Sequence, residues 1–364
     1  MTVIGFHNSH EQVHPAELLR AVQHAEEVGF TAAMCSDHFA PWNKAQGHSG
    51  FAWSWLGAAL ATTGLPLGVV NAPGQRYHPA IIAQAAATLA AMFPGRFWMA
   101  LGSGQVMNER ITGTPWPPKR VRDARLRESV DVIRALLAGE EVTHRGLVDV
   151  ERARIWSLPE QQPALIGPVM SVPTARRHAE WADGFITINQ PHQTLRELTG
   201  AYRDAGGRGR LVLQVHLCWD PDLDRAKAVA YEQWHTNTFP PPLCWDIDGP
   251  EAFEQASQHL PQEAVEGAVL VSSDLGQHAA WLAEFVDLGF DEIYLHHVGK
   301  EQLPFLDAFG AHVLPQLGAT APAPAIALGT PPGDGARRPG QPVPAGAHPV
   351  ADPLAGAVGP GGPR

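Results

Sequence analysis

Short apolar runs alternate with longer amphipathic stretches along most of the chain. Eight runs have the composition and length of strands: "TVIGFH", "AAMCSDH", "LPLGVVNA", "FWMALGSG", "PALIGPV", "GFITIN", "LVLQVHLCW" and "EIYLHHV". The stretches between them carry apolar residues at intervals of three or four, which is typical of helices that pack one face on a sheet. This alternation predicts a parallel sheet, and eight repeats favour a closed (β/α)8 TIM barrel over an open sheet.

Two of the predicted helices have well-marked ends. The segment "HPAELLRAVQHAEEVGF" carries Pro15 in its first turn and stops at Gly29, and "RDARLRESVDVIRALLAG" stops at Gly139. Proline near the start and glycine just past the end are favoured at helix termini. Two insertions interrupt the alternation, a hairpin-like one at residues 141–163 and one around "NTFPPPLCWDIDGPEAF". Long loops on a barrel usually shape its functional face.

The composition changes after Leu317. Residues 1–317 carry the alternating pattern and are predicted to form one barrel domain. Residues 318–364 are rich in Pro, Ala and Gly, and such a segment cannot bury enough apolar surface to offset the entropy of ordering it. We predict a disordered tail there.

Charge and cysteine usage favour a cytoplasmic protein with a small-molecule partner. The 364 residues carry a formal net charge of -11 and no basic block, so neither nucleic acid nor an anionic membrane surface is expected as a partner. The 3 cysteines are far apart and lack metal-ligand spacing, which fits a reducing compartment. The N-terminal segment does not resemble a secretion signal, and no apolar run is long enough to cross a membrane.

Polar side chains recur where the predicted strands end. Because functional groups of a parallel barrel lie at the carboxyl ends of its strands, these residues are expected to gather at one site. Asp37 and His38 are the strongest candidates, because they lie beside the aromatic Trp42 and not in a glycine-rich turn. The others are His7, Asn8, Asn71, Ser103, Gln105, Thr187, Asn189, His296 and His297.

The segment "LGSGQVMNE" predicts a close approach of the backbone to a ligand. Gly102 and Gly104 would permit it, although a single Gly-x-Gly is equally consistent with a tight turn. The 18 histidines include no clear metal-ligand spacing, so no metal is expected. A metal-dependent hydrolase on the same barrel therefore has no ligand set to support it.

Several of these segments resemble one family of enzymes. The segments "SDHFAPW", "RYHPAIIAQAAATLAAMFPGRFWMALGSG", "RLRESVDVIRALLAGE" and "WADGFIT" are similar to those of the luciferase-like flavin-dependent oxidoreductases. The resemblance is greatest to the branch that contains the deazaflavin (F420)-dependent glucose-6-phosphate dehydrogenase, and it runs from about Ile4 to Leu317. It implies a barrel of the bacterial-luciferase type, a flavin-type ring over the strand ends, and a homodimer.

The resemblance also assigns roles to residues. It places Asp37 and His38 at the active side of the ring, where the histidine stabilises charge or moves a proton. It implies that Trp42 shapes the substrate pocket. It further implies a non-proline cis peptide near Val70–Asn71 behind the ring.

Further along the chain, the resemblance implies that Asn108 and Glu109 help to hold the cofactor, but the sequence departs from the family in three places. Gln105 stands where the family has a proton-donating Glu, and Gln cannot act as a general acid. The positions that match the sugar phosphate's basic contacts, approximately Pro191, Gly267 and Leu303 or Pro304, carry no cation. The family's cofactor-phosphate glycines read "GPVMSVP" here, which leaves Ser171 for that role.

These departures favour FMN as the cofactor and a small uncharged substrate. The reaction would be hydride transfer or monooxygenation, with NAD(P)H or a partner flavin reductase as the source of electrons. The first alternative is an F420-dependent dehydrogenase or reductase that acts on a non-phosphorylated substrate. The second is a flavin-binding protein without turnover, which lost its acid at Gln105.

Overall fold

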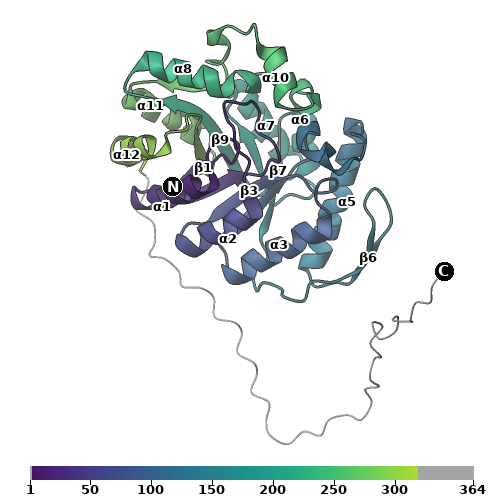
Figure 1. Ribbon diagram of the computed structural model, residues 1–364. Helices are drawn as coiled ribbons and strands as arrows, with labels where there is room; N and C mark the ends of the chain where they lie inside the picture. Colours follow the sequence, from purple (N-terminus) through teal and green to yellow (C-terminus); the bar gives the residue numbers. More distant parts are fainter. Residues whose placement is uncertain (1, 319–364) are drawn as a thin grey trace, which may run out of the picture. The chain divides into compact units, whose positions relative to one another are not determined.

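Eight parallel strands close into a barrel in the computed structural model, which describes residues 2–318 (Figure 1). Each strand pairs with the next, and the pairing of β8 with β9 closes the ring. All eight runs identified in the sequence form these strands, so the barrel prediction is confirmed. The strands are β1 (Val3–Asn8), β2 (Ala32–Ser36), β3 (Leu67–Asn71), β4 (Phe97–Leu101), β7 (Ala164–Pro168), β8 (Gly184–Ile188), β9 (Arg210–Trp219) and β11 (Glu292–His297).

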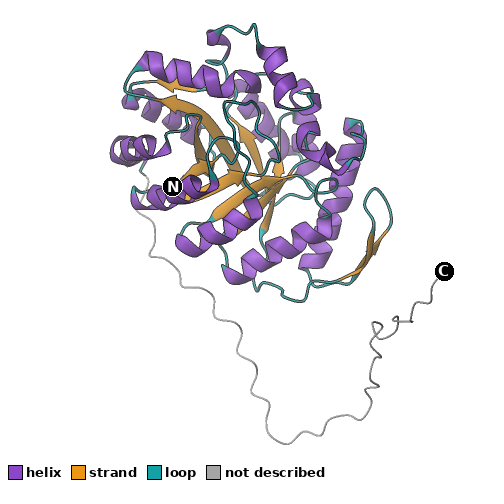
Figure 2. Cartoon of the chain, viewed as in Figure 1, coloured by secondary structure: helices purple, strands orange, loops and turns teal. Residues whose placement is uncertain are grey.

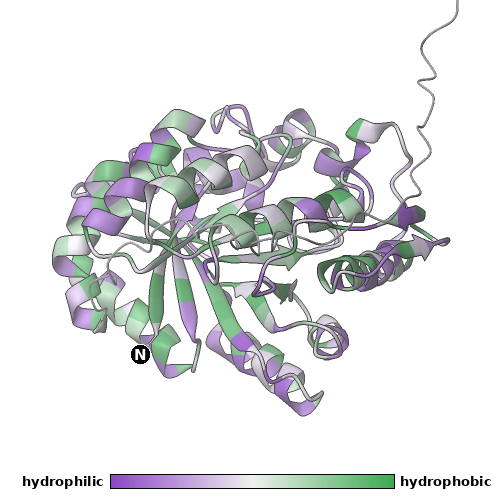
Figure 3. Ribbon diagram, turned by 90° about the horizontal axis from the view of Figure 1, so that it is seen from below, coloured by the Kyte–Doolittle hydropathy of each residue, from purple (hydrophilic) through white to green (hydrophobic). Residues whose placement is uncertain are grey.

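Helices surround the strands, as Figure 2 shows. Their apolar faces pack on the barrel, and Figure 3 shows the hydrophobic colouring concentrated along the strands and the inward faces of the helices. The principal helices are α1 (Pro15–Glu27), α2 (Ala52–Thr62), α3 (Pro79–Met92), α5 (Lys119–Leu137), α6 (Val172–His178), α7 (His192–Asp204), α8 (Leu223–Trp234), α11 (Leu275–Asp287) and α12 (Gln302–His312).

The insertions form short elements outside this pattern. The first contains the antiparallel hairpin of β5 (Val142–His144) and β6 (Val150–Ala153), as its sequence predicts. The second contains α9 (Leu243–Asp246) and α10 (Pro250–Ser257), and α4 (Val106–Glu109) follows the glycine-rich turn. A ninth strand of the sheet, β10 (Leu270–Ser272), pairs with the end of β9. Its three residues are too short to show a period in the sequence.

Local sequence signals set the helix ends. Pro15 is the first residue of α1, and Nδ1 of the preceding His14 accepts a hydrogen bond from the Ala16 amide at 3.3 Å. Gly29 and Gly139 follow α1 and α5 with φ values of +107° and +86°, where L residues are strained. Both helix ends therefore lie where the sequence predicts them.

Large aromatic side chains fill the barrel at the amino-terminal half of its strands. The rings of Trp98 on β4 and Tyr294 on β11 lie 5.8 Å apart between their centroids. Glycines on neighbouring strands make room for them, because a Cβ at Gly68 would lie 2.0 Å from the Trp98 ring and one at Gly5 would lie 2.4 Å from the Tyr294 ring. At the amino-terminal strand ends this layer meets an ion pair, since Tyr294 donates to Glu292 and Arg210 pairs with the same carboxylate.

Two expectations bear on the remaining parts of the chain. The disordered tail predicted for residues 318–364 lies, apart from Gly318, outside the described residues. Within residues 2–318, no helix combines the length and hydropathy that a membrane crossing requires.

Replacement of Gly68 by alanine tests the aromatic layer. Because the new Cβ would overlap the Trp98 ring, the free energy of unfolding should fall by about 1–3 kcal/mol in urea denaturation. Gly57→Ala is the matched control: Gly57 lies in α2 with no atom within 4 Å of the added Cβ, so that variant should be as stable as the parent or more so. Equal stability of both variants would contradict the packing described.

Candidate active site

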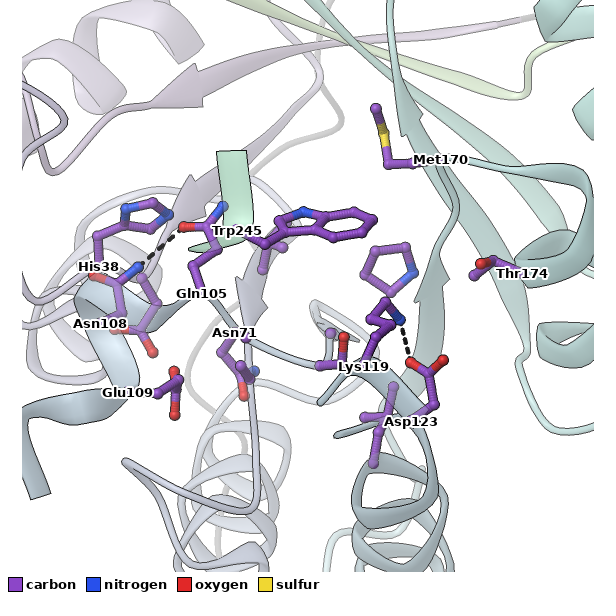
Figure 4. Close-up of a pocket in the computed structure, with 18 of the residues that line it drawn as sticks. His38, Asn71, Gln105, Asn108, Glu109, Lys119, Asp123, Met170, Thr174 and Trp245 are labelled. Carbon is purple, nitrogen blue, oxygen red and sulfur yellow. Dashed lines mark hydrogen bonds and ion pairs between the residues drawn. The ribbon is translucent and has the colours of Figure 1, made fainter. Parts of the chain in front are cut away.

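A pocket opens at the carboxyl ends of β2, β3, β4 and β7 (Figure 4). The strand ends supply its floor, and residues from α4, α5, α6 and α9 complete its walls. Ten of the predicted site residues line it: Asp37, His38, Val70, Asn71, Gly102, Ser103, Gly104, Gln105, Asn108 and Glu109. The others, His7, Asn8, Trp42, Ser171, Thr187, Asn189, His296 and His297, are not among its lining residues.

Trp42 and Ser171 lie beside the pocket. The centroid of the Trp42 ring lies 5.2 Å from that of the His38 ring and 5.2 Å from that of the Phe253 ring, so Trp42 packs beside His38. Ser171 is exposed, and its Oγ lies 3.0 Å from Oγ1 of Thr174, which does line the pocket.

A buried carboxylate adjoins His38. Glu11 Oε1 lies 3.3 Å from His38 Nδ1, and Glu11 Oε2 accepts hydrogen bonds from Ser36 Oγ at 2.5 Å and Ser9 Oγ at 3.0 Å. Burial acts to raise the pKa of Glu11, but His38 and the Ser36 hydroxyl outweigh it, so the pKa lies below its ordinary value. Glu11 is therefore an anion beside the imidazole, and its contact with Nδ1 is electrostatic, because the geometry falls short of a hydrogen bond.

Burial sets the charge of His38. Removal from water lowers the pKa of His38, and the Glu11 carboxylate opposes that shift without cancelling it. The imidazole is therefore neutral near pH 7. With Nδ1 beside Glu11, Nε2 is the nitrogen left to exchange a proton with a ligand.

Asp37 is held by its own set of partners. Tyr77 donates to Asp37 Oδ1 at 3.0 Å, and Arg76 Nη2 lies 3.4 Å from the same oxygen. Burial raises the pKa of Asp37, while Arg76 and Tyr77 act against the increase. Because Asp37 is engaged by Tyr77 and Arg76, the carboxylate that contacts His38 is Glu11. Glu11 lies three residues after β1 and was not among the residues predicted from the sequence.

The turn after β4 is also fixed by hydrogen bonds. Asn108 Oδ1 accepts from the Phe39 amide at 2.9 Å, and its Nδ2 donates to Gln105 Oε1 at 3.2 Å, the contact dashed in Figure 4. Glu109 Oε2 accepts from the Arg76 amide at 2.8 Å, and burial raises the pKa of Glu109. The Gln105 carbonyl is therefore occupied, and its Nε2 remains as a donor.

Asn71 has the features of a ligand-binding side chain. It is buried at the end of β3, lines the pocket, and has no hydrogen-bond partner at either Oδ1 or Nδ2. Leaving the buried Asn71 amide without hydrogen-bond partners costs stability, and the polar edge of a bound ligand would supply those partners.

The predicted cis peptide near Val70–Asn71 is wrong. Asn71 stays in register with Leu101 of β4, and the cis bond of residues 2–318 is Pro241–Pro242.

Several residues of the far wall have no clear sequence signal. Lys119 and Asp123 form an ion pair one turn apart at the start of α5, and Thr174 and His178 come from α6. An i,i+4 pair on a helix is ordinarily a solvated surface pair. Trp245 of α9 faces the same pocket from the second insertion (Figure 4).

Neutral histidines occupy the barrel beside the pocket. The rings of His7 and His296 lie 4.3 Å apart, and Gln214 Nε2 lies 3.1 Å from both His216 Nε2 and His296 Nδ1. Burial lowers the pKa of His7 to about 4 and that of His216 to about 3. Within residues 2–318, no three His, Cys, Asp or Glu side chains are grouped to hold a metal ion.

Comparison with known proteins gives a consistent result. The family model described as luciferase-like monooxygenase matches residues 1–292. A protein of Microbacterium testaceum named F420-dependent glucose-6-phosphate dehydrogenase is 36% identical over 327 residues, which cover 86% of this chain and 96% of that protein. The protein of the same name from Beutenbergia cavernae is 34% identical over 332 residues, with coverage of 88% and 98%.

Solved structures agree with these matches. An F420-dependent secondary alcohol dehydrogenase in complex with an F420–acetone adduct aligns with a TM-score of 0.80 and 27% identity, over 87% of this chain and 99% of that chain. The F420-dependent tetrahydromethanopterin reductase of Methanopyrus kandleri has a TM-score of 0.69 at 18% identity, over 86% and 99%, and shares the fold.

Removal of the Glu11 charge should lower the pKa of His38. In Glu11→Gln the anion that favours the protonated imidazole is gone, while the burial that disfavours it remains. NMR titration of the His38 ring, assigned with His38→Asn, measures the change. Glu128→Gln, which removes the carboxylate beside His144 on the surface, is the control and should leave the His38 titration unchanged. Identical His38 curves in parent and Glu11→Gln would rule out the pairing.

Protein stability should fall as the pH drops below about 6.5. Burial lowers the pKa of His7 and His10 to about 4 in the folded protein, so the unfolded chain binds more protons in this window. Each such histidine contributes a slope of ~1.4 kcal/mol per pH unit. Denaturation between pH 7 and 4.5 should show a smaller slope for His10→Phe and the parent slope for the exposed His259→Gln. A parent slope in His10→Phe would show that His10 is charged when buried.

Proposed function

The chain belongs to the luciferase-like monooxygenase family of oxidoreductases, and from this premise we propose that it transfers hydride between F420 and a small, uncharged secondary alcohol or its ketone. The relatives' names support the cofactor, since those at 34–36% identity are called F420-dependent. The secondary alcohol dehydrogenase at 27% identity supports the substrate class. FMN, the cofactor favoured from the sequence, is the competing prediction that the experiments below distinguish.

The pairing of His38 with Glu11 carries the proposal. Bound F420 would supply a ring carbon that takes or gives a hydride without oxygen. Oxidation of an alcohol then requires a base for the hydroxyl proton as the carbon–hydrogen bond breaks. Neutral His38, with Nδ1 beside Glu11 at 3.3 Å, provides that base at Nε2 and returns the proton in the reverse direction. The reaction therefore needs no carboxylic acid at Gln105.

The pocket fits a flat, polar-edged cofactor. The unpaired amide of Asn71 offers one donor and one acceptor to a ring edge. A Cβ at Gly102 would meet no atom closer than Asn71 O at 3.6 Å, so a side chain there would enter the pocket without a clash in the protein. These features support a ring stacked against the ends of β3 and β4.

The charges of the pocket argue against a phosphorylated sugar. Lys119 is the cation among its lining residues, and it is paired with Asp123. Gln105 and Trp245 are neutral. A phosphate dianion would lack the charge-assisted hydrogen bonds that usually stabilise it in a protein site. An uncharged alcohol or ketone meets no such penalty.

Cofactor choice is tested by titration of the purified protein with F420 and with FMN, monitored by fluorescence. F420 should bind more tightly, and Gly102→Val should raise its Kd about tenfold or more, a loss of ~1.4 kcal/mol, because the new side chain occupies the pocket. Gly200→Val, on a helix surface with no atom within 4 Å of the added Cβ, is the control and should keep the parent Kd. Tighter binding of FMN would reject the F420 proposal.

Substrate class is tested by reduction of F420 with a series of secondary alcohols and with glucose 6-phosphate. The alcohols should be oxidised and the sugar phosphate should not. His38→Asn should lower kcat by about 10²–10⁴-fold and leave the Kd for F420 nearly unchanged, because only the proton acceptor is removed. Turnover of glucose 6-phosphate alone, or full activity of His38→Asn, would contradict the assignment.

A further inference from the structure

The short helix α9 contributes one residue to the wall of the pocket. Its chain neighbours belong to the insertion between β9 and β10, whereas its contacts are with α4 and with the segment that leads into α5. Trp245 is its pocket-lining residue and appears in Figure 4 with His38, Gln105 and Met170. No residue of α9 is fully buried, so an apolar core does not hold the helix in place.

Polar contacts hold α9 instead. Asp246 Oδ1 accepts hydrogen bonds from Trp116 Nε1 at 2.8 Å and from Arg122 Nη1 at 3.0 Å. Two residues further on, Asp248 Oδ2 lies 2.5 Å from Arg110 Nη1. Both aspartates thus connect the insertion to the segment between β4 and α5 and to the first turn of α5.

The contacts of Asp246 are of the kind that allow α9 to move away from the pocket. The Arg122 side chain is 2% exposed and its guanidinium lies 4.1 Å from the Trp116 ring centroid. The two residues that donate to Asp246 are therefore held in place by their own packing. The Asp246 side chain is 46% exposed, and ion pairs with an exposed partner contribute little to stability. Segments held by exposed polar contacts and few apolar ones open most readily.

The face that α9 turns to the pocket is apolar and uncharged. Lys119 Nζ lies 5.4 Å from the centroid of the Trp245 ring, but its charge is offset by the ion pair with Asp123. An indole makes favourable contact with alkyl or aryl groups, and its single N–H carries no charge to balance a phosphate dianion. Its size also limits what can lie between it and His38.

From this arrangement we propose that α9 is the movable outer wall of the substrate site, and that Trp245 is a specificity-determining residue that admits uncharged alcohols with small substituents and excludes bulky ones. This inference rests on the proposed function, which supplies the reaction. It adds the residue that selects among substrates. Asp246 acts on specificity through Trp245, by holding α9 closed.

Trp245→Ala tests the selection. With a graded series of secondary alcohols, the ratio of kcat/KM for bulky to small members should rise at least tenfold, mainly through KM, while the Kd for F420 stays as in the parent. Trp245→Phe should give an intermediate ratio. Trp156→Ala, which removes an indole that is 85% exposed after the hairpin, is the control and should leave the ratio unchanged. An unchanged ratio in Trp245→Ala would overturn the proposal.

Binding of the same alcohols, measured by ligand-observed NMR, provides a test that needs no turnover. If no alcohol reduces F420, the proposed function fails, yet Trp245→Ala must still bind bulky members more tightly than the parent does. If its binding profile equals that of the parent, the assignment of Trp245 fails, whatever the activity.

Limited proteolysis tests the movement without cofactor or substrate. Asp246→Asn should be cleaved within residues 239–250 several-fold faster than the parent, because the contacts with Trp116 and Arg122 are weakened. Asp131→Asn, which alters an exposed ion pair with Arg127 within α5, is the matched control and should be cleaved at the parent rate. Equal cleavage of Asp246→Asn and the parent would show that these contacts do not hold α9 closed.

Discussion

The site depends on one buried anion, Glu11, placed beside His38. A carboxylate taken out of water is costly unless hydrogen bonds and a positive or polarisable partner compensate it. Ser9, Ser36 and His38 do so here, with contacts of 3.0, 2.5 and 3.3 Å. The histidine gains a nearby negative charge in return, so a single contact between the loop after β1 and the end of β2 places the proton acceptor beside its counter-charge before any ligand binds.

Along the strands of the barrel, the side chains that stabilise the fold and the side chains that form the site lie at opposite ends. In the amino-terminal half, Trp98 and Tyr294 pack against glycines on neighbouring strands, and the charged groups there, Arg210 and Glu292, are paired with each other. In the carboxyl half, histidines and Asn71 are buried with few partners, an arrangement that costs stability. The protein tolerates these groups because the packed layer and the surrounding helices supply the stabilising burial.

Sequence periodicity was sufficient to predict the barrel, because the buried surface of each strand and helix leaves a pattern of apolar residues within that element. It also located most of the pocket, since polar residues at strand ends must meet once the barrel closes. It could not identify Glu11 as the partner of His38, because that contact depends on how the loop after β1 folds back. Trp245 was missed for the same reason: only the folded insertion brings it to a pocket built at the ends of β2, β3, β4 and β7, all far earlier in the chain. The trans geometry at Val70–Asn71 shows that a resemblance does not fix every local detail.

Transfer of deuterium from a secondary alcohol labelled at its carbinol carbon tests the central claim most directly. After incubation of the protein with the labelled alcohol and F420 under exclusion of oxygen, mass spectrometry of the reduced cofactor should find one deuterium per molecule, and the His38→Asn variant should transfer it far more slowly. If F420 acquires no deuterium while reduced FMN on the protein consumes oxygen, the hydride-transfer account is wrong and the protein is an oxygen-using flavoprotein.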